Sequence, residues 1–311
     1  MDPSLTSAMT SPIPDNVTET WLPSSDGTEV YTRIYAASNP HAVILFMHSF
    51  SGHCVHYEWM HGVYAAREIT VFAFDQRSFG WTALDAEAKT GQTLYGKTSW
   101  PQQLADIEWW IKHVKDRHPN LPVFLMGHSM GSALALAFAT RASAPPTKET
   151  VASLSGIVAS SPFILRVTPT VRHVRFFGWL LSLVLPNYVV HTPINPSNLS
   201  HDSTKNEANA RDPRIVHKGS LRCLNDMLSG GEQLLWKENK HWPQNLPLLI
   251  IHGTADRVTS YKGSEEFFYK IKADDKEFKP FQDGFHELAY EPDGVKEKFT
   301  DECISWILKH A

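Results

Sequence analysis

The stretch PVFLMGHSMG, residues 122–131, decides the fold of this chain, because an apolar strand leads there directly into a glycine-serine-glycine turn. The spacing of Gly127, Ser129 and Gly131 is that of a nucleophile elbow, a sharp turn between a strand and a helix. A serine at such a turn adopts strained dihedral angles, and the two glycines remove the Cβ atoms that would collide there. We therefore expect the Ser129 hydroxyl to be open to substrate.

The residues on both sides of this turn support the same interpretation. Residues 123–126 are too short and too apolar for anything but a buried strand, as in the middle of a parallel sheet. Residues 132–139 favour a helix whose small side chains allow close approach to that sheet. The alternative, a serine in an ordinary turn, is weaker because it does not account for the order of strand, turn and helix.

The composition excludes several classes of protein. The chain has 311 residues, 42% of them hydrophobic and 20% charged, as in an ordinary globular protein. The formal net charge of −4 and the lack of a basic run argue against a nucleic-acid partner. Three scattered cysteines predict neither a disulfide framework nor a metal site. Without a secretory signal or an 18-residue apolar run, we expect a cytoplasmic protein, with peripheral contact to membranes or lipid droplets left open.

Strands and helices alternate along most of the chain. A turn at residues 24–27 predicts an antiparallel hairpin at the sheet edge. Residues 102–117 predict a helix with one apolar face. Apolar runs that predict buried strands lie at residues 43–47, 71–74, 123–126, 156–159 and 248–251. This alternation predicts an α/β fold with a mostly parallel central sheet and helices on both faces.

The alternation breaks between Pro162 and Trp242, which predicts a cap inserted above the carboxyl edge of the sheet. The expected division is an N-terminal tail at 1–20, a core at 21–161 and 243–311, and a cap at 162–242. Residues 176–185 are apolar almost all round. They predict either a helix buried against the core, or an acyl-binding wall or a patch that touches lipid.

A serine hydroxyl needs a base within hydrogen-bond reach, and the base needs a carboxylate that stabilises its charged form. Where a nucleophile elbow is present, these partners follow in the order Ser, Asp, His. Asp256 follows an apolar strand and a glycine-containing loop, although an aspartate there is also a common helix N-cap. His286 follows the short run 278–281 and is the expected base, ahead of His310 at a helix end.

Catalysis at Ser129 also needs an oxyanion hole. Its donors are expected to be the backbone N–H after the nucleophile and one from the loop after an early strand. In this chain those groups belong to Met130 and to Phe50, which follows the strand at 43–47.

Five segments together resemble the monoacylglycerol lipase group of serine hydrolases, fungal members in particular. They lie at residues 47–57, 74–80, 127–131, 253–257 and 284–287. The resemblance covers nearly the whole chain from about Trp21. It implies an α/β-hydrolase fold with a cap, and release of fatty acid from a monoglyceride through an acyl-serine on Ser129, without metal or cofactor. The expected substrate pocket contains His53, His56, Phe163, Trp179 and Leu183.

The chain departs from that family at two backbone positions. Ser49 and Ser78 stand where the family has glycine. If either position needs a positive φ, a Cβ atom there costs about 1–2 kcal/mol. At Ser49 that strain would fall on the oxyanion loop.

Other departures concern the pocket for the leaving alcohol. Gly52 and His56 stand where relatives carry a Glu and an Arg that hydrogen-bond glycerol, and Ala289 stands where animal relatives have a His. A pocket that binds hydroxyls loses discrimination when its polar partners go. Two alternatives to a monoglyceride lipase therefore stay open. One is a hydrolase or acyltransferase on a specialised-metabolite ester or thioester, and the other is a protein that binds a ligand without turnover.

Overall fold

The computed structural model describes residues 15–85 and 94–311. Its centre is an eight-stranded sheet with the strand order β1-β2-β4-β3-β5-β6-β9-β10. The strands are β1 (Val17–Pro23), β2 (Glu29–Tyr35), β3 (Ala42–Met47), β4 (Ile69–Phe74), β5 (Val123–His128), β6 (Gly156–Ser160), β9 (Leu248–Gly253) and β10 (Lys276–Phe281). The hairpin β1–β2 is antiparallel and lies at one edge, where β2 also pairs antiparallel with β4. The other pairs in this order, β4-β3-β5-β6-β9-β10, are parallel. The predicted hairpin, buried strands and mostly parallel sheet are confirmed.

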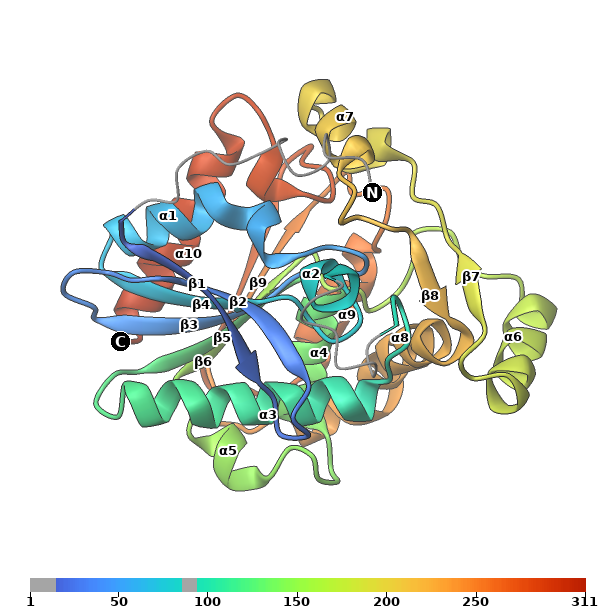
Figure 1. The fold of residues 1–311 in the computed structure, drawn as a ribbon, viewed down its shortest axis with the longest axis horizontal. Helices are drawn as coiled ribbons and strands as arrows, with labels where there is room; N and C mark the ends of the chain where they lie inside the picture. The colour runs from blue at the N-terminus through green and yellow to red at the C-terminus, as the bar shows by residue number, and fades with distance from the viewer. Residues whose placement is uncertain (1–14, 86–93) are drawn as a thin grey trace.

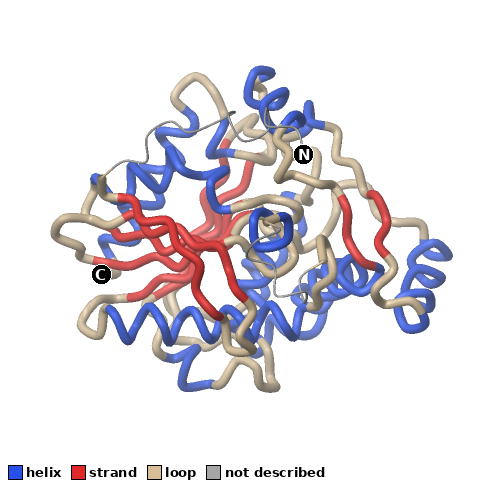
Figure 2. Tube along the Cα trace, in the orientation of Figure 1, coloured by secondary structure: helices blue, strands red, loops and turns tan. Residues whose placement is uncertain are grey.

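Helices cover both faces of this sheet (Figures 1 and 2). The helices α1 (Glu58–Ala66) and α10 (Val295–Lys309) pack on one face, and α3 (Trp100–Arg117), α4 (Met130–Thr140) and α9 (Tyr261–Lys270) on the other. Two short helices, α2 (Gly80–Leu84) and α5 (Lys148–Ala152), complete this part. The predicted apolar face of α3 is buried, as periodicity indicates for a helix on a sheet. The fold is that of an α/β hydrolase.

The strand register brings distant segments together at the carboxyl edge of the sheet. Met47 at the end of β3 is opposite Gly127 in β5, so the loop after β3 and the turn after β5 begin side by side. Phe281 at the end of β10 is likewise opposite Gly253 at the end of β9. Because the strands are parallel, four loops that are far apart in the sequence start from one edge.

The segment between β6 and β9 contains its own small elements. They are α6 (Arg172–Val184), β7 (Val189–His191), η3 (Pro196–Asn198), α7 (Ser203–Arg211), β8 (Lys218–Ser220), α8 (Leu221–Gln233), η4 (Leu234–Glu238) and η5 (Asn239–His241). The strands β7 and β8 form a separate antiparallel pair. Figure 1 shows α6, β7, β8 and α8 gathered on one side of the molecule. The division into core and cap at residues 162 and 242 stays a prediction.

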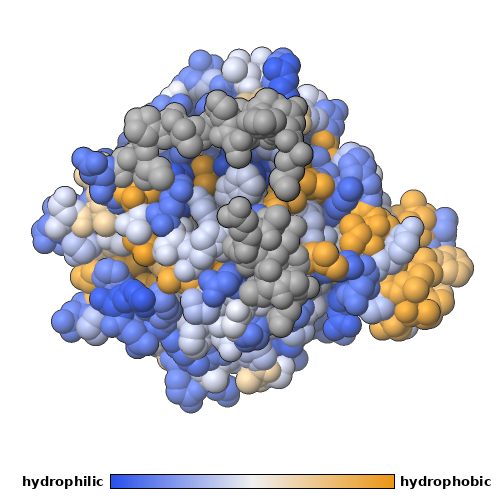
Figure 3. Space-filling view, in the orientation of Figure 1, coloured by the Kyte–Doolittle hydropathy of each residue, from blue (hydrophilic) through white to orange (hydrophobic). Residues whose placement is uncertain are grey.

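Helix α6 corrects one expectation. The apolar run at 176–185 is helical, but it is not buried against the core: its large apolar side chains are 42–70% exposed, and Ser182 is its buried residue. Figure 3 shows the resulting apolar patch over α6. The helix lies against α8 along one side, where Arg175 donates to Asn225 and Ser229. Polar contacts therefore attach α6 to the molecule, and its apolar side chains face outward.

None of the helices in residues 15–85 and 94–311 combines the length and the apolar character needed to cross a bilayer.

Candidate active site

Ser129 lies at the turn between β5 and α4 with φ 55° and ψ −115°, a conformation that costs about 1–3 kcal/mol in a residue with a Cβ atom. Its backbone N–H donates to the Ser160 carbonyl at 2.9 Å, which ties the turn to the neighbouring strand. A Cβ at Gly127 would collide with the Gly131 backbone, and one at Gly131 with the Met47 carbonyl. Both glycines are therefore required by close backbone approach, as the elbow motif predicts.

Asp256 lies in the loop after β9 and is surrounded by donors. Its Oδ2 atom is 2.8 Å from His286 Nδ1 and 3.0 Å from His252 Nε2, and it accepts the Thr259 hydroxyl at 2.7 Å. Its Oδ1 atom accepts the backbone N–H groups of Val258 and Thr259. Burial by itself raises the pKa of this carboxyl, but the two histidine rings and their hydrogen bonds lower it well below its usual range. Asp256 is thus a buried, ionised acceptor.

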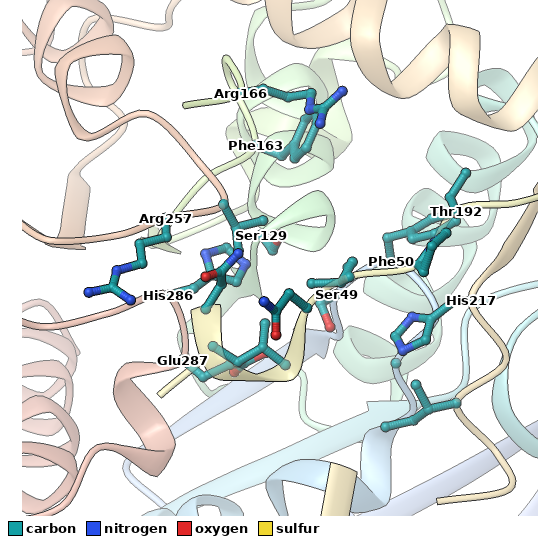
Figure 4. Close-up of a pocket in the computed structure, with 18 of the residues that line it drawn as sticks. Ser49, Phe50, Ser129, Phe163, Arg166, Thr192, His217, Arg257, His286 and Glu287 are labelled. Atoms are coloured by element: carbon teal, nitrogen blue, oxygen red, sulfur yellow. The ribbon is translucent and has the colours of Figure 1, made fainter. Parts of the chain in front are cut away.

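His286 is nearly fully buried in the loop after β10. Burial lowers the pKa of its ring, but the Asp256 carboxylate outweighs that effect, and the pKa lies above the ordinary histidine value. Because the carboxylate accepts at Nδ1, Nε2 is the nitrogen left for a neighbouring hydroxyl. His286 and Ser129 line the same cavity, and Figure 4 shows them next to each other. The structure therefore brings together the three residues that the sequence singled out.

The two residues expected to supply the oxyanion donors are Met130, which follows Ser129 in the chain, and Phe50, which lines the same cavity as Ser129. Met130 is the first residue of α4, so its N–H has no acceptor within that helix. Phe50 lines the cavity, and its ring packs against Phe79. Next to it, burial lowers the pKa of His48 to about 4, so that the neutral ring accepts the Gln76 N–H at Nε2. This bond holds the start of the oxyanion loop against the loop after β4.

The two glycine-to-serine departures have different outcomes. Ser49 is not among the residues with positive φ, so the expected strain does not fall there. The left-handed residue of that loop is Ser51, with φ 60°, and its carbonyl accepts the Tyr95 hydroxyl. Ser78 does adopt φ 70°, and its hydroxyl donates to the Lys97 carbonyl at 2.7 Å. The strain of a Cβ in the left-handed region is thus present at Ser78 and partly offset by a hydrogen bond.

The cavity that contains Ser129 and His286 has a volume of about 460 Å³ and a mixed lining. The segment between β6 and β9 supplies its large apolar side chains, Phe163, Leu199, Ile215, Leu224, Met227 and Leu228, and also polar ones such as Arg166, Thr192 and His217. The core supplies further polar groups, from Ser49, His56 and Glu287. In the view of Figure 4, Ser49 and Glu287 lie on one side of Ser129 and Phe163 on the other.

Two of the five predicted pocket residues, His56 and Phe163, line this cavity, and three do not. His53 is buried and directs Nε2 to Asp212 at 3.1 Å, because an ionised carboxylate in the same interior attracts it. Trp179 and Leu183 are 42% and 56% exposed on the outward side of α6. For these three residues the prediction was wrong, since the sequence did not indicate which way the side chains turn.

Sequence reasoning missed the wall supplied by α8 and the carboxylate at Glu287. Leu224, Met227 and Leu228 recur at intervals of three and four residues, so a helical face could have been recognised. Glu287 directly follows His286, and this adjacency could have identified it as a residue of the site. Its approach to the cavity depends on the loop conformation, which the sequence does not specify.

Comparisons with known proteins agree with this geometry. A family model described as "Serine aminopeptidase, S33" matches residues 38–293. A protein of Schizosaccharomyces pombe is 29% identical over 91% of this chain and 72% of its own length, and the monoglyceride lipase of Rattus norvegicus is 26% identical over 94% and 92%. A solved structure, a soluble variant of monoglyceride lipase from Saccharomyces cerevisiae in complex with a substrate analogue, superposes with a TM-score of 0.84 at 23% identity. It covers 94% of this chain and 95% of that chain.

Proposed function

The chain belongs to the serine hydrolase family described as "Serine aminopeptidase, S33", and we propose that within it this protein is a monoacylglycerol lipase. The observation that carries the proposal is the cavity at Ser129, whose lining combines large apolar side chains for an acyl chain with polar groups for an alcohol. The names of the relatives from rat and yeast support a monoglyceride as the ester.

The proposed reaction has two halves, acylation of Ser129 and hydrolysis of the acyl-serine. His286 removes the proton of the Ser129 hydroxyl as its oxygen attacks the ester carbonyl, and then protonates the departing glycerol. Asp256 remains ionised and stabilises the imidazolium. The N–H groups of Phe50 and Met130 stabilise the negative oxygen of the tetrahedral intermediate. In the second half His286 activates water, which releases the fatty acid from the acyl-serine.

We also propose that residues 162–242 act as a cap whose outer helix contacts a lipid surface. The side chains of Phe176, Phe177 and Leu183 are each more than half exposed, and single-chain proteins rarely leave such a patch in water. The segment 163–201 contains three arginines and no aspartate or glutamate. Arg175 pairs with Glu232 on α8, whereas Arg166 and Arg172 have no ion pair among the described residues. An apolar helix beside such cations favours a membrane with anionic lipid.

The lipid contact is tested by flotation with vesicles of phosphatidylcholine, with and without phosphatidylglycerol. A variant with Phe176→Ser, Phe177→Ser and Leu183→Ser should stay unbound and still hydrolyse a soluble short-chain ester at the normal rate. Tyr269→Ser on α9 is the control, because Tyr269 is 73% exposed on a helix that packs against the central sheet and does not belong to residues 162–242. Equal flotation of all three proteins contradicts the proposal.

The hydrolase proposal is tested by labelling and by product analysis. A fluorophosphonate probe should label the wild type and not Ser129→Ala. Monooctanoylglycerol should yield octanoate and glycerol in equal amounts, and prolyl p-nitroanilide, a substrate for an aminopeptidase, should be left intact. Absence of labelling favours a binding protein, and transfer of octanoate to an added alcohol in place of water favours an acyltransferase.

A further inference from the structure

Glu287 is a buried carboxylate in the wall of the catalytic cavity that the mechanism above does not use. It directly follows His286, and it is 4% exposed. Its side chain lines the cavity together with Ser129, His286, Ser49 and His56. Figure 4 shows Glu287 beside His286, on the side of Ser129 away from Phe163. A buried carboxylate so close to the reacting atoms requires a physical explanation.

The two oxygens of this carboxylate have different surroundings. Oε1 lies 3.1 Å from Nε2 of His128 and 3.5 Å from the Tyr57 hydroxyl. Oε2 is buried and has no hydrogen-bond partner among the described residues. A buried polar atom without a partner is costly, and in native proteins it usually marks a place where a water, an ion or a substrate group binds.

The carboxylate is ionised in this environment. Burial by itself raises the pKa of Glu287, but the His128, His56 and His286 rings around it lower the pKa below the ordinary glutamate value. An ionised carboxylate accepts hydrogen bonds and donates none. The missing partner of Oε2 must therefore be a donor.

We propose that Glu287 binds a free hydroxyl of the leaving alcohol and so sets the preference of the enzyme for esters of polyols. The inference rests on the proposed function, because it takes the alcohol to depart beside His286. That ring must protonate the alcohol oxygen as its bond to the acyl carbon breaks and the acyl group stays on Ser129, so a hydroxyl on the adjacent carbon of the alcohol comes within reach of the next residue in the loop.

His56 supplies a second polar group on the same side of the cavity. Burial lowers the pKa of its ring to about 3, so that the ring is neutral near pH 7 and offers one donor and one acceptor. Its position is fixed by edge-to-face contacts with Tyr57 and Tyr290. Glu287 and His56 together offer both kinds of hydrogen-bonding partner to a diol, whereas the wall formed by Leu224, Met227 and Leu228 offers none.

The test compares two esters of one acid, monooctanoylglycerol and propyl octanoate. Their leaving alcohols have the same carbon skeleton and differ by two hydroxyls. The quantity measured is the ratio of their kcat/KM values, glyceryl ester over propyl ester. Any general effect of Glu287 on His286 changes both esters alike and cancels in this ratio, so the ratio reports contact with the hydroxyls.

Glu287→Gln is the main variant, because the amide keeps an oxygen for His128 and Tyr57 and removes the charge and one acceptor. Its ratio should fall roughly tenfold, as expected when a charged acceptor for a substrate hydroxyl is lost. Glu287→Asp keeps the charge but moves it away from the cavity by the length of one methylene, so it should also lower the ratio. This variant replaces Glu287→Gln in the test if the glutamine variant is unstable.

Glu291→Gln is the matched control. Glu291 is a buried carboxylate four residues further along the same loop, where it accepts the Phe285 N–H at 2.6 Å and does not line the cavity. Its substitution should lower both rates alike and leave the ratio at the wild-type value. An equal fall of the ratio in this variant would mean that loop distortion, not contact with Glu287, sets the preference, and would overturn the inference.

The outcomes separate this inference from the proposed function. A wild type that cleaves propyl octanoate and spares the glyceryl ester refutes the lipase assignment. A wild type that prefers the glyceryl ester, with an unchanged ratio in Glu287→Gln and Glu287→Asp, refutes the role of Glu287 alone. Cleavage of prolyl p-nitroanilide that is lost in Glu287→Gln would assign the carboxylate to a substrate ammonium and would likewise overturn the inference.

Discussion

His252 Nε2 lies 3.0 Å from Oδ2 of Asp256, the same oxygen that faces His286 Nδ1 at 2.8 Å. A carboxylate only accepts, so both imidazole nitrogens that face it carry protons. The other ring nitrogen of His252, Nδ1, lies 2.9 Å from Ser264 Oγ. A histidine within strand β9 thus orients the carboxylate that orients the proposed base.

This relationship predicts that His252→Leu lowers both stability and turnover. The free energy of unfolding should fall by about 1–3 kcal/mol, because the buried Asp256 loses a donor and Ser264 a hydrogen-bond partner. The value of kcat should fall roughly 10- to 100-fold, because a less tightly held carboxylate lets His286 shift. Urea unfolding and steady-state kinetics measure the two effects. Ser264→Ala, which removes only the outer partner, is the control, and wild-type turnover in His252→Leu would contradict the prediction.

The pH dependence of kcat/KM follows from the raised pKa of His286. The ring must be neutral to act as a base, so activity should disappear as the pH falls through a value above the ordinary histidine pKa of about 6.5. In Asp256→Asn the carboxylate at position 256 no longer raises the pKa of His286, so that burial, which lowers this pKa, has the larger effect. The acidic limb should therefore move to lower pH while the plateau falls about 10⁴-fold. A limb that stays in place in this variant would show that Asp256 does not set the pKa.

The strain at Ser129 predicts that the active enzyme is less stable than an inactive variant. Ser129→Gly removes the Cβ atom and so relieves a backbone strain of about 1–3 kcal/mol. The glycine also makes the unfolded chain more flexible, which costs about 0.5–1 kcal/mol on folding. Its free energy of unfolding should rise by about 1 kcal/mol. Ser129→Ala keeps the Cβ and should show no such gain. Denaturant unfolding of the two inactive variants checks this, and equal stabilities would mean that the elbow stores no strain.

Ser78 allows a parallel test in which a hydrogen bond opposes the strain. Ser78→Ala keeps the left-handed Cβ and loses the bond to the Lys97 carbonyl, so it should cost about 1 kcal/mol of stability. Ser78→Gly loses the same bond but also relieves about 1–2 kcal/mol of strain, so it should be the more stable of the two variants. Thermal unfolding compares them, and the opposite order would contradict the assigned φ.

The parts of this structure that were predictable have local causes. The turn at Ser129 needs glycines because backbones meet there, and those glycines can be recognised in the sequence. The order of Ser129, Asp256 and His286 along the chain was sufficient to propose the three residues, because parallel strands end at one edge and place their following loops together. The strand pattern and the apolar face of α3 follow from residue periodicity in the same way.

The features that the sequence did not predict depend on whether a helix or side chain faces the core, the cavity or the solvent. The run at 176–185 has the same composition whether it is buried or exposed, and it is exposed. Trp179 and Leu183 were therefore placed in the pocket and lie outside it, and His53 turns to Asp212. Ser49 and Ser78 both stand where the family that the sequence resembles has glycine, yet of these two only Ser78 takes a positive φ.

By itself, the sequence determined the fold class and the nucleophile elbow, and it was enough to propose the nucleophile, the base and the carboxylate that orients the base, because each of these depends on local geometry or on chain order. The tertiary structure alone decided which side chains line the cavity, that Glu287 leaves one oxygen without a partner, and that α6 faces outward. The physical reason is that burial and hydrogen-bond partnership arise between segments distant in the chain, and an amino-acid pattern specifies the period of a segment but not its neighbours.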